Sequence, residues 1–265
     1  MANPTDQRSP QKKEPTLPFN AAGLITFYNA MFKPQGFSLP PHLYPVAHAL
    51  MDERIEKLMI VLGPGAGKSL LVSVSFAAFI LGQRPWSTVL EVSAGEGLVQ
   101  GFLKAVMDWV EWNPQWKLFF PDVSPDKDKG WSTERGLYVR GHESGDPDAS
   151  LFCAGLTSSV LTGKHAKLLI LDDIHNRENS ATELQCKSVQ KTYYDTLLGR
   201  ANPTGARFVV TGRRWAESDV YGHLKETGEF VCMELPAIRK DTTEMSWTIT
   251  CPAKLRCVFN ESPNA

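Results

Sequence analysis

The sequence predicts an α/β protein in which helices cover both faces of a mainly parallel sheet. Three observations lead to this prediction. Short, almost wholly apolar runs recur along the chain, as expected for strands that are buried on both faces of a parallel sheet. Longer segments between them carry apolar residues at helical spacing. A glycine-rich segment also joins the first apolar run directly to one of these helical segments.

The predicted elements follow one another in alternating order. Two helices, 20–32 and 43–55, precede the first strand and form an N-terminal helical preface. The predicted strands are 58–62, 88–93, 167–171, 207–211 and 229–235. The helices that follow them are predicted at 69–81, 98–112, 180–198 and 218–228.

Capping and turn residues predict where helices begin and where loops lie. The sequence Ser180-Ala181-Thr182-Glu183 is a capping box that begins one helix, and Ser218 is expected to cap the next. Residues 113–130 contain several prolines and charges, which predicts a loop. Residues 136–140 and 150–154 are expected to pair as a hairpin around a turn that contains Gly145, Asp146 and Pro147.

Composition limits the classes of function. The chain has 265 residues, of which 42% are hydrophobic, so it can hold one large domain, alone or with an appendage. The net charge of −1 excludes a protein that coats nucleic acid through general basicity. Any DNA contact must therefore come from a local patch or from several subunits acting together.

Cysteine usage and hydropathy predict a cytoplasmic protein without membrane association. No stretch has the apolar length of a membrane span, and the N-terminus is too polar for a signal peptide. The cysteines form no CxxC pair and no metal-ligand spacing with histidine, so we expect reduced thiols. These cysteines are Cys153, Cys186, Cys232, Cys251 and Cys257.

Residues 63–69, with the sequence Gly-Pro-Gly-Ala-Gly-Lys-Ser, carry the strongest functional signal. A buried strand, a glycine-rich turn and a helix that opens with Lys-Ser are typical of the phosphate-binding loop (P-loop) of a nucleoside triphosphatase. Backbone N–H groups would bind phosphate oxygens, Lys68 would reach the β- and γ-phosphates, and Ser69 would bind Mg²⁺. The expected ATP-binding residues are Gly63, Pro64, Gly65, Ala66, Gly67, Lys68, Ser69 and Leu70.

The pattern is irregular at one position. The usual pattern has a glycine five residues before the Gly67-Lys68 step, where this chain has Leu62, and Gly63 and Gly65 supply flexibility from shifted positions. The alternative is a chance glycine-rich turn between a strand and a helix. The strand before the turn and the helix after it favour the phosphate loop. The predicted fold class is therefore a P-loop NTPase of the ASCE/RecA-like type.

Two adjacent carboxylates follow the apolar run 167–171. Because the strands of a parallel sheet end at one edge, Asp172 and Asp173 are expected to face the phosphate loop. Asp172 is suited to hold Mg²⁺ directly or through water, and Asp173 to orient or activate the water that attacks the γ-phosphate. The alternative is a solvated turn or helix entry.

The end of the next predicted strand carries further candidates. Thr211 would occupy a sensor position near the γ-phosphate, where its hydroxyl distinguishes ATP from ADP. Arg213, Arg214 and Trp215 follow, and this basic and aromatic cluster would transmit the nucleotide state, contact a neighbouring subunit or touch DNA. The alternative is a solvated basic loop that a tryptophan anchors in the core.

Taken in order, these motifs resemble the ATPase domain of the large terminase subunit of tailed bacteriophages. The resemblance runs from about Pro40 to about Ile238, and four stretches carry it: 58–69, 161–173, 206–215 and 217–224. In that family a Thr-Gly-basic segment precedes the Asp-Asp strand. An Arg-Trp motif and an acidic, helix-forming stretch follow the sensor strand.

The resemblance implies roles for individual residues. Lys68 and Asp173 would be catalytic, Ser69 and Asp172 would hold Mg²⁺, and ATP would be the substrate. Thr211 and Arg214 fall in the motif that couples hydrolysis to movement. Ser93 resembles the helicase-like motif through which the nucleotide site communicates with DNA. Lys164 lies where related motors carry a basic residue that reaches a neighbour's nucleotide.

The resemblance also implies partners. The family drives double-stranded DNA into a procapsid as a homo-oligomeric ring, pentameric in related motors, docked on the portal protein and assisted by a small terminase subunit. Its place of action is the host cytoplasm, at the portal vertex of the procapsid. Two rival hypotheses stay open: a DNA translocase or helicase-like ATPase that acts without a capsid, and an assembly subunit that binds nucleotide as a switch and hydrolyses little.

Three departures from the family pattern matter. Many relatives carry arginine inside the loop where this chain has Gly65, so the positive charge must come from elsewhere, including an adjacent subunit. Asp173 is one methylene shorter than the glutamate of many ATPases. No acidic cluster after Thr211 resembles the nuclease site of large terminases, which leaves a nuclease on a separate polypeptide as one option. The candidates for the missing charge are Lys164, Arg135, Arg140 and Arg200.

We therefore expect three regions along the chain. Residues 1–17 form a flexible N-terminal arm, because they are rich in polar residues and proline. Residues 18–238 form the P-loop ATPase domain. Residues 239–265 form a linker or peripheral strands, because their periodicity is weak.

Overall fold

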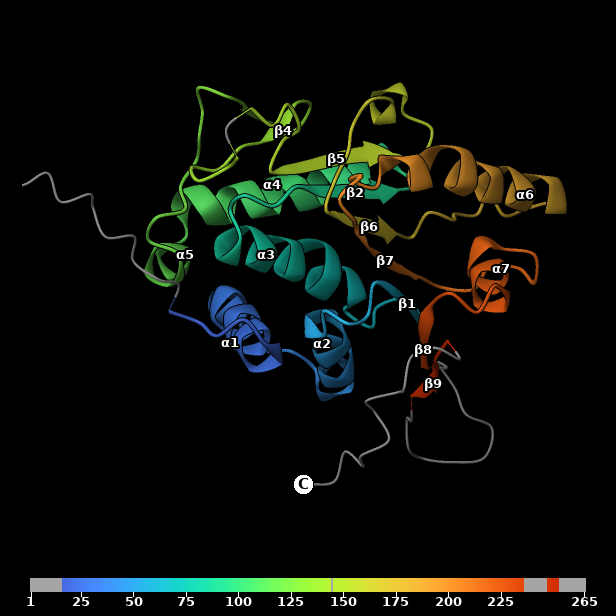
Figure 1. Cartoon of the computed structure of the whole chain (residues 1–265). Coiled ribbons are helices and arrows are strands. Elements are labelled where there is room, and N and C mark those ends of the chain that lie inside the picture. Colours follow the sequence, from blue (N-terminus) through green and yellow to red (C-terminus); the bar gives the residue numbers. More distant parts are fainter. Residues whose placement is uncertain (1–15, 144, 236–246, 253–265) are drawn as a thin grey trace, which may run out of the picture.

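A nine-stranded, mainly parallel sheet forms the centre of the protein (Figure 1). The structure is a computed structural model, and it describes residues 16–143, 145–235 and 247–252. The strand order is β3-β4-β5-β2-β6-β7-β1-β8-β9. The six strands from β5 to β8 in this order run parallel, and the short strands at both edges pair antiparallel. This architecture confirms the predicted α/β fold class.

All five predicted strands are present. The strands are β1 Lys57–Leu62, β2 Val89–Ser93, β3 Trp131–Ser132, β4 Gly136–Leu137, β5 Leu151–Gly155, β6 Leu168–Asp172, β7 Arg207–Gly212, β8 Val231–Leu235 and β9 Thr248–Thr250. The predicted hairpin is shorter than expected. Only Leu137 and Leu151 pair as β4 and β5, because Val139 bridges to Pro125 instead.

Helices before and between the strands cover the sheet. The α-helices are α1 Ala21–Phe32, α2 Tyr44–Met51, α3 Ala77–Gln83, α4 Glu96–Trp112, α5 Pro114–Phe119, α6 Glu183–Thr192 and α7 Val220–Glu226. Two segments are π-helical, η3 Leu70–Phe76 and η5 Tyr193–Leu197. Short 3₁₀ helices are η1 Lys33–Gln35, η2 Pro41–Leu43, η4 Ser159–Leu161 and η6 Leu198–Arg200. Among the described residues, no helix is both long and apolar enough to cross a lipid bilayer.

Two hydrophobic cores lie on opposite faces of the sheet. Along β1, Leu58 and Ile60 belong to the core formed with α1, α2, η3, α3 and α4. Met59 and Val61 belong to the core formed with α6, η5 and α7. Burial on both faces explains why β1 is apolar at every position from Leu58 to Leu62. Figure 1 shows the helical preface, α1 and α2, beside the η3–α3 helix.

The predicted loop 113–130 contains a helix. Asn113 caps α5 by accepting a hydrogen bond from the Gln115 N–H at 2.8 Å, and Pro114 occupies the first helical position. Proline is favoured there because the backbone N–H that it lacks would have no hydrogen-bond partner within the helix. Trp116 is fully buried and donates to the Val123 carbonyl at 2.8 Å. The proline therefore marks a helix start, and the prediction of a loop was wrong for these residues.

Two predicted caps shift by one or two positions. Thr182, and not Ser180, is the N-cap of α6, and its hydroxyl accepts from the Gln185 N–H. Asp219, and not Ser218, caps α7 by accepting from the Gly222 N–H at 2.8 Å. In each case a later residue of the same polar run is the N-cap, and its side chain reaches the N–H group three residues ahead.

The ends of the predicted regions lie mostly outside the described residues. Within the predicted arm, Thr16 and Leu17 already contact the core: Thr16 donates to the Phe119 carbonyl, and the Leu17 carbonyl accepts from Gln83. Within the predicted tail, β9 pairs antiparallel with β8 as a peripheral strand. Cys153, Cys186 and Cys232 are free and buried, whereas Cys251 is disulfide-bonded, so the prediction of reduced thiols was wrong at Cys251.

Candidate functional site

The glycine-rich loop 63–69 connects β1 to η3 at the edge where the parallel strands end. Gly65 and Gly67 have φ values of 77° and 83°. This left-handed conformation favours glycine, so the turn requires glycine at the shifted position Gly65 and at the regular position Gly67, but not at Gly63. Pro64 and Gly65 are exposed, whereas the Lys68 side chain is only 8% exposed. The irregular sequence thus forms an open turn followed by an inward-pointing lysine.

The N-terminal preface holds this loop from the side. His42 Nε2 donates a hydrogen bond to the Ala66 carbonyl at 3.0 Å, since the carbonyl oxygen can only accept. A Cβ atom on Gly67 would lie 3.3 Å from Leu43, so the preface also packs closely on the loop backbone. Trp247 donates to the His42 carbonyl at 2.9 Å. Sequence reasoning missed His42 and Trp247, because no local pattern links them to the loop.

Asp172 ends β6 and is 1% exposed. The Ser73 hydroxyl, on the π-helical segment η3, donates to Asp172 Oδ2 at 2.8 Å. Burial raises the pKa of Asp172 to about 6, and the Asp173 charge adds to this effect. The hydroxyls of Ser69 and Ser73 and the charge of Lys68 oppose the rise. The structure therefore brings together Ser69 and Asp172, the two predicted metal ligands, and adds Ser73 beside them.

Asp173 follows in an unusual backbone conformation. Its φ is 47°, and among the described residues it is the one non-glycine residue with a positive φ. Such strain persists where the surrounding structure fixes it, often at functional sites. Its N–H donates to the Thr211 carbonyl at 2.8 Å and its carbonyl accepts from Ala94. The carboxylate Oδ2 lies 2.7 Å from Lys68 Nζ.

Several buried oxygens at this edge have no hydrogen-bond partner within the described part of the chain. They are Asp172 Oδ1, Asp173 Oδ1, Ser93 Oγ and Thr211 Oγ1. Buried polar groups normally find partners, so this concentration indicates a place for water, a cation or a ligand. Oxygen donors are the ligands that Mg²⁺ prefers. In the described ranges, no group of three or more His, Cys, Asp or Glu side chains is arranged to hold a metal ion.

Arg214 lies at the N-terminus of α7. Its Nε lies 2.9 Å from Asp219 Oδ1, and its Nη2 donates to the carbonyls of Ala216 and Glu217. These contacts fix the N-terminus of α7. The Arg213 guanidinium stacks on the Trp215 ring at 3.7 Å. Thr211, the last residue but one of β7, is fully buried and lies beside Asp172 in the register of β6 and β7.

The four candidates for an added positive charge lie away from the glycine-rich loop. Lys164 Nζ is 3.4 Å from Asp148, which precedes β5, and Arg200 donates to the carbonyls of Leu161 and Thr196. Arg135 and Arg140 are exposed and flank β4, which pairs with the first residue of β5. Lys164 and Arg200 lie near the start of β6, where the Arg200 carbonyl accepts from the Ala166 N–H. Among the described residues, no hydrogen bond or ion pair joins any of the four side chains to residues 63–69.

Comparisons with known proteins give structural matches at low sequence identity. No protein-family model and no curated protein sequence matches the chain. The chain resembles large-terminase ATPase domains in structure. An arginine-to-alanine mutant of the ATPase domain of the Thermus phage P74-26 large terminase matches with a TM-score of 0.48 and 15% identity, over 77% of this chain and 83% of that chain. A second structure of that ATPase domain matches with a TM-score of 0.43 and 17% identity, over 70% and 69%.

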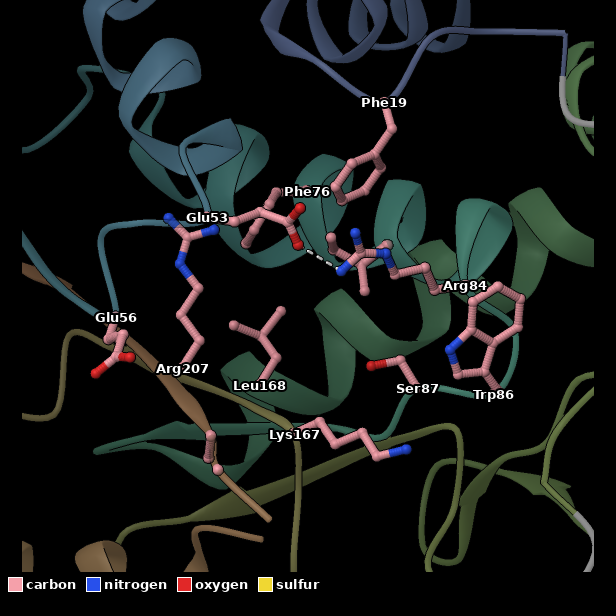
Figure 2. A pocket seen from close by; sticks show the side chains of 13 residues that line it. Phe19, Glu53, Glu56, Phe76, Arg84, Trp86, Ser87, Lys167, Leu168 and Arg207 are labelled. Atoms are coloured by element: carbon pink, nitrogen blue, oxygen red, sulfur yellow. Dashed lines mark hydrogen bonds and ion pairs between the residues drawn. The ribbon is translucent and has the colours of Figure 1, made fainter. Parts of the chain in front are cut away.

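A pocket of about 360 Å³ opens at the opposite edge of the sheet, where the strands begin (Figure 2). Its cations already have partners. Arg84 pairs with Glu53 at 2.6 Å, and the Arg207 guanidinium donates to the carbonyls of Ala49, Leu50 and Asp52 at the end of α2. Burial lowers the pKa of Arg207 to about 10. These contacts stabilise the preface, and we assign the pocket no part in nucleotide chemistry.

Proposed function

We propose that the chain is a Mg²⁺-dependent ATPase. The observation that carries this proposal is the meeting of Lys68 with Asp173, and of Ser69 with Asp172, at the end of a glycine-rich turn. Residues from two separate stretches of sequence converge there, and each has the chemistry that phosphoryl transfer requires. A chance glycine-rich turn would not bring a buried lysine and two carboxylates to the same edge.

Each side chain would have a defined part. Lys68 would exchange its contact with Asp173 for the β- and γ-phosphates, while backbone N–H groups of the loop bind the other phosphate oxygens. Ser69 and Asp172 would hold Mg²⁺, which when bound neutralises phosphate charge. Asp173 would orient the attacking water and accept its proton. Ser73 would keep the Asp172 carboxylate in place through its hydrogen bond.

The proposed biological role is a motor that drives double-stranded DNA into a viral procapsid. The order and combination of the four sequence stretches support this role. The motor would act as a ring on the portal protein, with a small terminase subunit as partner. A net charge of −1 is compatible with DNA contact, because a few Lys and Arg side chains on each subunit supply phosphate contacts around a ring.

Phosphate release by the wild type and by Lys68→Ala and Asp173→Asn variants tests the ATPase. The three proteins are compared alone, with double-stranded DNA, and with portal-bearing procapsids. We expect hydrolysis by the wild type only, with stimulation by DNA or procapsids. Hydrolysis that DNA stimulates fully without procapsids would favour a translocase that acts without a capsid. Equal inactivity of all three proteins under every condition would favour the nucleotide-binding switch.

A further inference from the structure

Tyr221, on the first turn of α7, reaches the end of β7 beside the proposed catalytic carboxylates. Tyr221 is fully buried. Its hydroxyl oxygen lies 2.2 Å from the position that a Cβ atom of Gly212 would occupy. Gly212 ends β7 directly after Thr211, and Thr211 pairs with Asp172. The absence of a side chain at Gly212 therefore lets the tyrosine hydroxyl approach this edge of the sheet.

The Tyr221 hydroxyl and one oxygen of the Asp173 carboxylate both lack hydrogen-bond partners within the described part of the chain. Among the described residues, neither Tyr221 Oη nor Asp173 Oδ1 makes a hydrogen bond, although both atoms are buried. Burial raises the pKa of Tyr221 well above its usual value, and the charges of Asp173 and then Asp172 raise it further, while an interaction of the hydroxyl with the His175 backbone opposes the rise. The phenol therefore keeps its proton and has a donor available. A buried donor at the same edge of the sheet as a buried, unsatisfied acceptor can pair with it, and the local electrostatics favour such a pairing.

The tyrosine ring is held firmly by the segment that follows Asp173. It packs against the His175 ring with centroids 5.8 Å apart. His175 Nε2 accepts a hydrogen bond from the Val220 N–H at 3.0 Å, so its proton is on Nδ1, which faces Asn179 Oδ1 at 3.1 Å. Burial lowers the pKa of His175 and keeps the ring neutral. The first turn of α7 and the loop after Asp173 thus form one connected unit.

We propose that Tyr221 is a positioning residue for Asp173. Tyr221 Oη and Asp173 Oδ1 make no direct hydrogen bond in this structure. When Lys68 turns to phosphate, the hydroxyl donates to the free Oδ1 of the carboxylate, directly or through one water molecule, and holds the carboxylate in place. This inference rests on the proposed ATPase function. The physical reason for this role is that the Lys68 ammonium group cannot keep the same ion pair with Asp173 while it binds a phosphate group. A buried carboxylate that loses its cation needs another donor to stay charged and oriented.

Steady-state kinetics of Tyr221→Phe test this role. We expect kcat to fall about 10- to 100-fold, the range for loss of a hydrogen bond to a charged group, while KM for ATP changes less than about 2-fold. Tyr193→Phe is the matched control, because Tyr193 is equally buried in the same hydrophobic core. It should leave kcat and KM unchanged. Thermal melting of both variants reports any general loss of packing.

A spectroscopic measurement tests the contact without turnover. The chain has six tyrosines, so NMR spectra of protein labelled with ¹³C at tyrosine Cζ are simple, and the resonance lost in Tyr221→Phe is assigned to Tyr221. Asp173→Asn should shift this resonance. Asp108→Asn, an exposed aspartate on α4, should not. An inactive wild type would contradict the proposed function, and the NMR comparison then decides the Tyr221 inference alone. Either of two results overturns the Tyr221 inference. One is an unchanged kcat for Tyr221→Phe in an enzyme that is active as the wild type, and the other is a Tyr221 resonance that does not shift in Asp173→Asn.

Discussion

The Lys68 ammonium group lies 2.7 Å from the Asp173 carboxylate, although the two residues are 105 positions apart in the chain. The pair is largely buried, since the Lys68 side chain is 8% exposed and that of Asp173 is 27% exposed. A carboxylate and a phosphate group would compete for the same ammonium group. Nucleotide affinity and hydrolysis should therefore respond in opposite directions when Asp173 is changed.

The variant Asp173→Asn separates these two effects. We expect ATP to bind several-fold more tightly, because Lys68 is released from its ion pair. Hydrolysis should fall about 100-fold or more, because an amide cannot accept the proton of the attacking water. Titration with a fluorescent ATP analogue gives the affinity, and phosphate release gives the rate. Asp108→Asn, which changes an exposed ion pair with Lys104, should alter neither quantity. Weaker binding together with near-normal hydrolysis would show that Asp173 has no part in the chemistry.

The variant Asp172→Asn should stabilise the metal-free protein while it removes activity. The folded pKa of about 6 exceeds the ordinary value of 3.8. The folded state therefore binds its proton more tightly than the unfolded chain, and ionising Asp172 costs the folded protein stability. The wild type should lose up to about 3 kcal/mol of unfolding free energy as pH rises from about 4 to 6, and this cost persists at pH 7.

Urea unfolding at a series of pH values, with chelator present, measures this effect. The difference in stability between Asp172→Asn and wild type should grow between pH 4 and 6 in favour of the variant, then level off. Ser73→Ala should destabilise the wild-type protein at pH 7, because it removes a hydrogen bond to the charged carboxylate. A stability difference that stays constant with pH would show that Asp172 has an ordinary pKa in the folded protein.

The sheet could be predicted from the sequence because its signal is local. The strand 167–171 is buried on both faces and therefore reads as a continuous apolar run. The helix 98–112 is buried on one face and carries apolar residues at helical spacing. The prediction failed at Pro114, because proline breaks a helix in its interior but is favoured at the first helical position. Asn113, which caps α5 directly before Pro114, was the overlooked sign that a helix begins there.

The candidate site could be predicted only as separate motifs. Lys68, Ser69, Asp172 and Asp173 were identified because each belongs to a short pattern beside an apolar run. His42, Ser73 and Tyr221 were missed because their roles depend on contacts across the chain. Arg214 was predicted from its motif alone, and its ion pair with Asp219 depends on how α7 begins.

The variant His42→Ala should weaken ATP binding without unfolding the protein. His42 holds the Ala66 carbonyl at 3.0 Å and so fixes the turn before Lys68. Loss of one neutral hydrogen bond should raise KM for ATP about 3- to 10-fold, with little change in the melting temperature. His48→Ala is the control, because His48 is exposed on the neighbouring helix α2. An unchanged KM would mean that the loop keeps its shape without support from the preface.

Mixing two inactive variants tests whether a neighbouring subunit supplies the missing positive charge. Lys164→Ala would leave each subunit's own Asp173 intact, whereas Asp173→Asn would leave Lys164 intact. If Lys164 acts across the interface, mixed rings on portal and DNA should regain activity, because an intact Asp173 then meets an intact neighbouring lysine at about one site in four by random assembly. The same mixture is made with alanine variants of Arg135, Arg140 and Arg200.

Only a residue that acts across the interface can be complemented in this way. If a lysine or arginine is needed for the fold of its own subunit, its alanine variant should stay inactive in every mixture. The control is Arg54→Ala, which removes an exposed ion pair with Asp52 and should be active throughout. We expect one of the four candidates to complement Asp173→Asn, because none of them reaches the glycine-rich loop of its own subunit. Failure of all four in assembled rings would mean that the charge comes from a different residue or is not required.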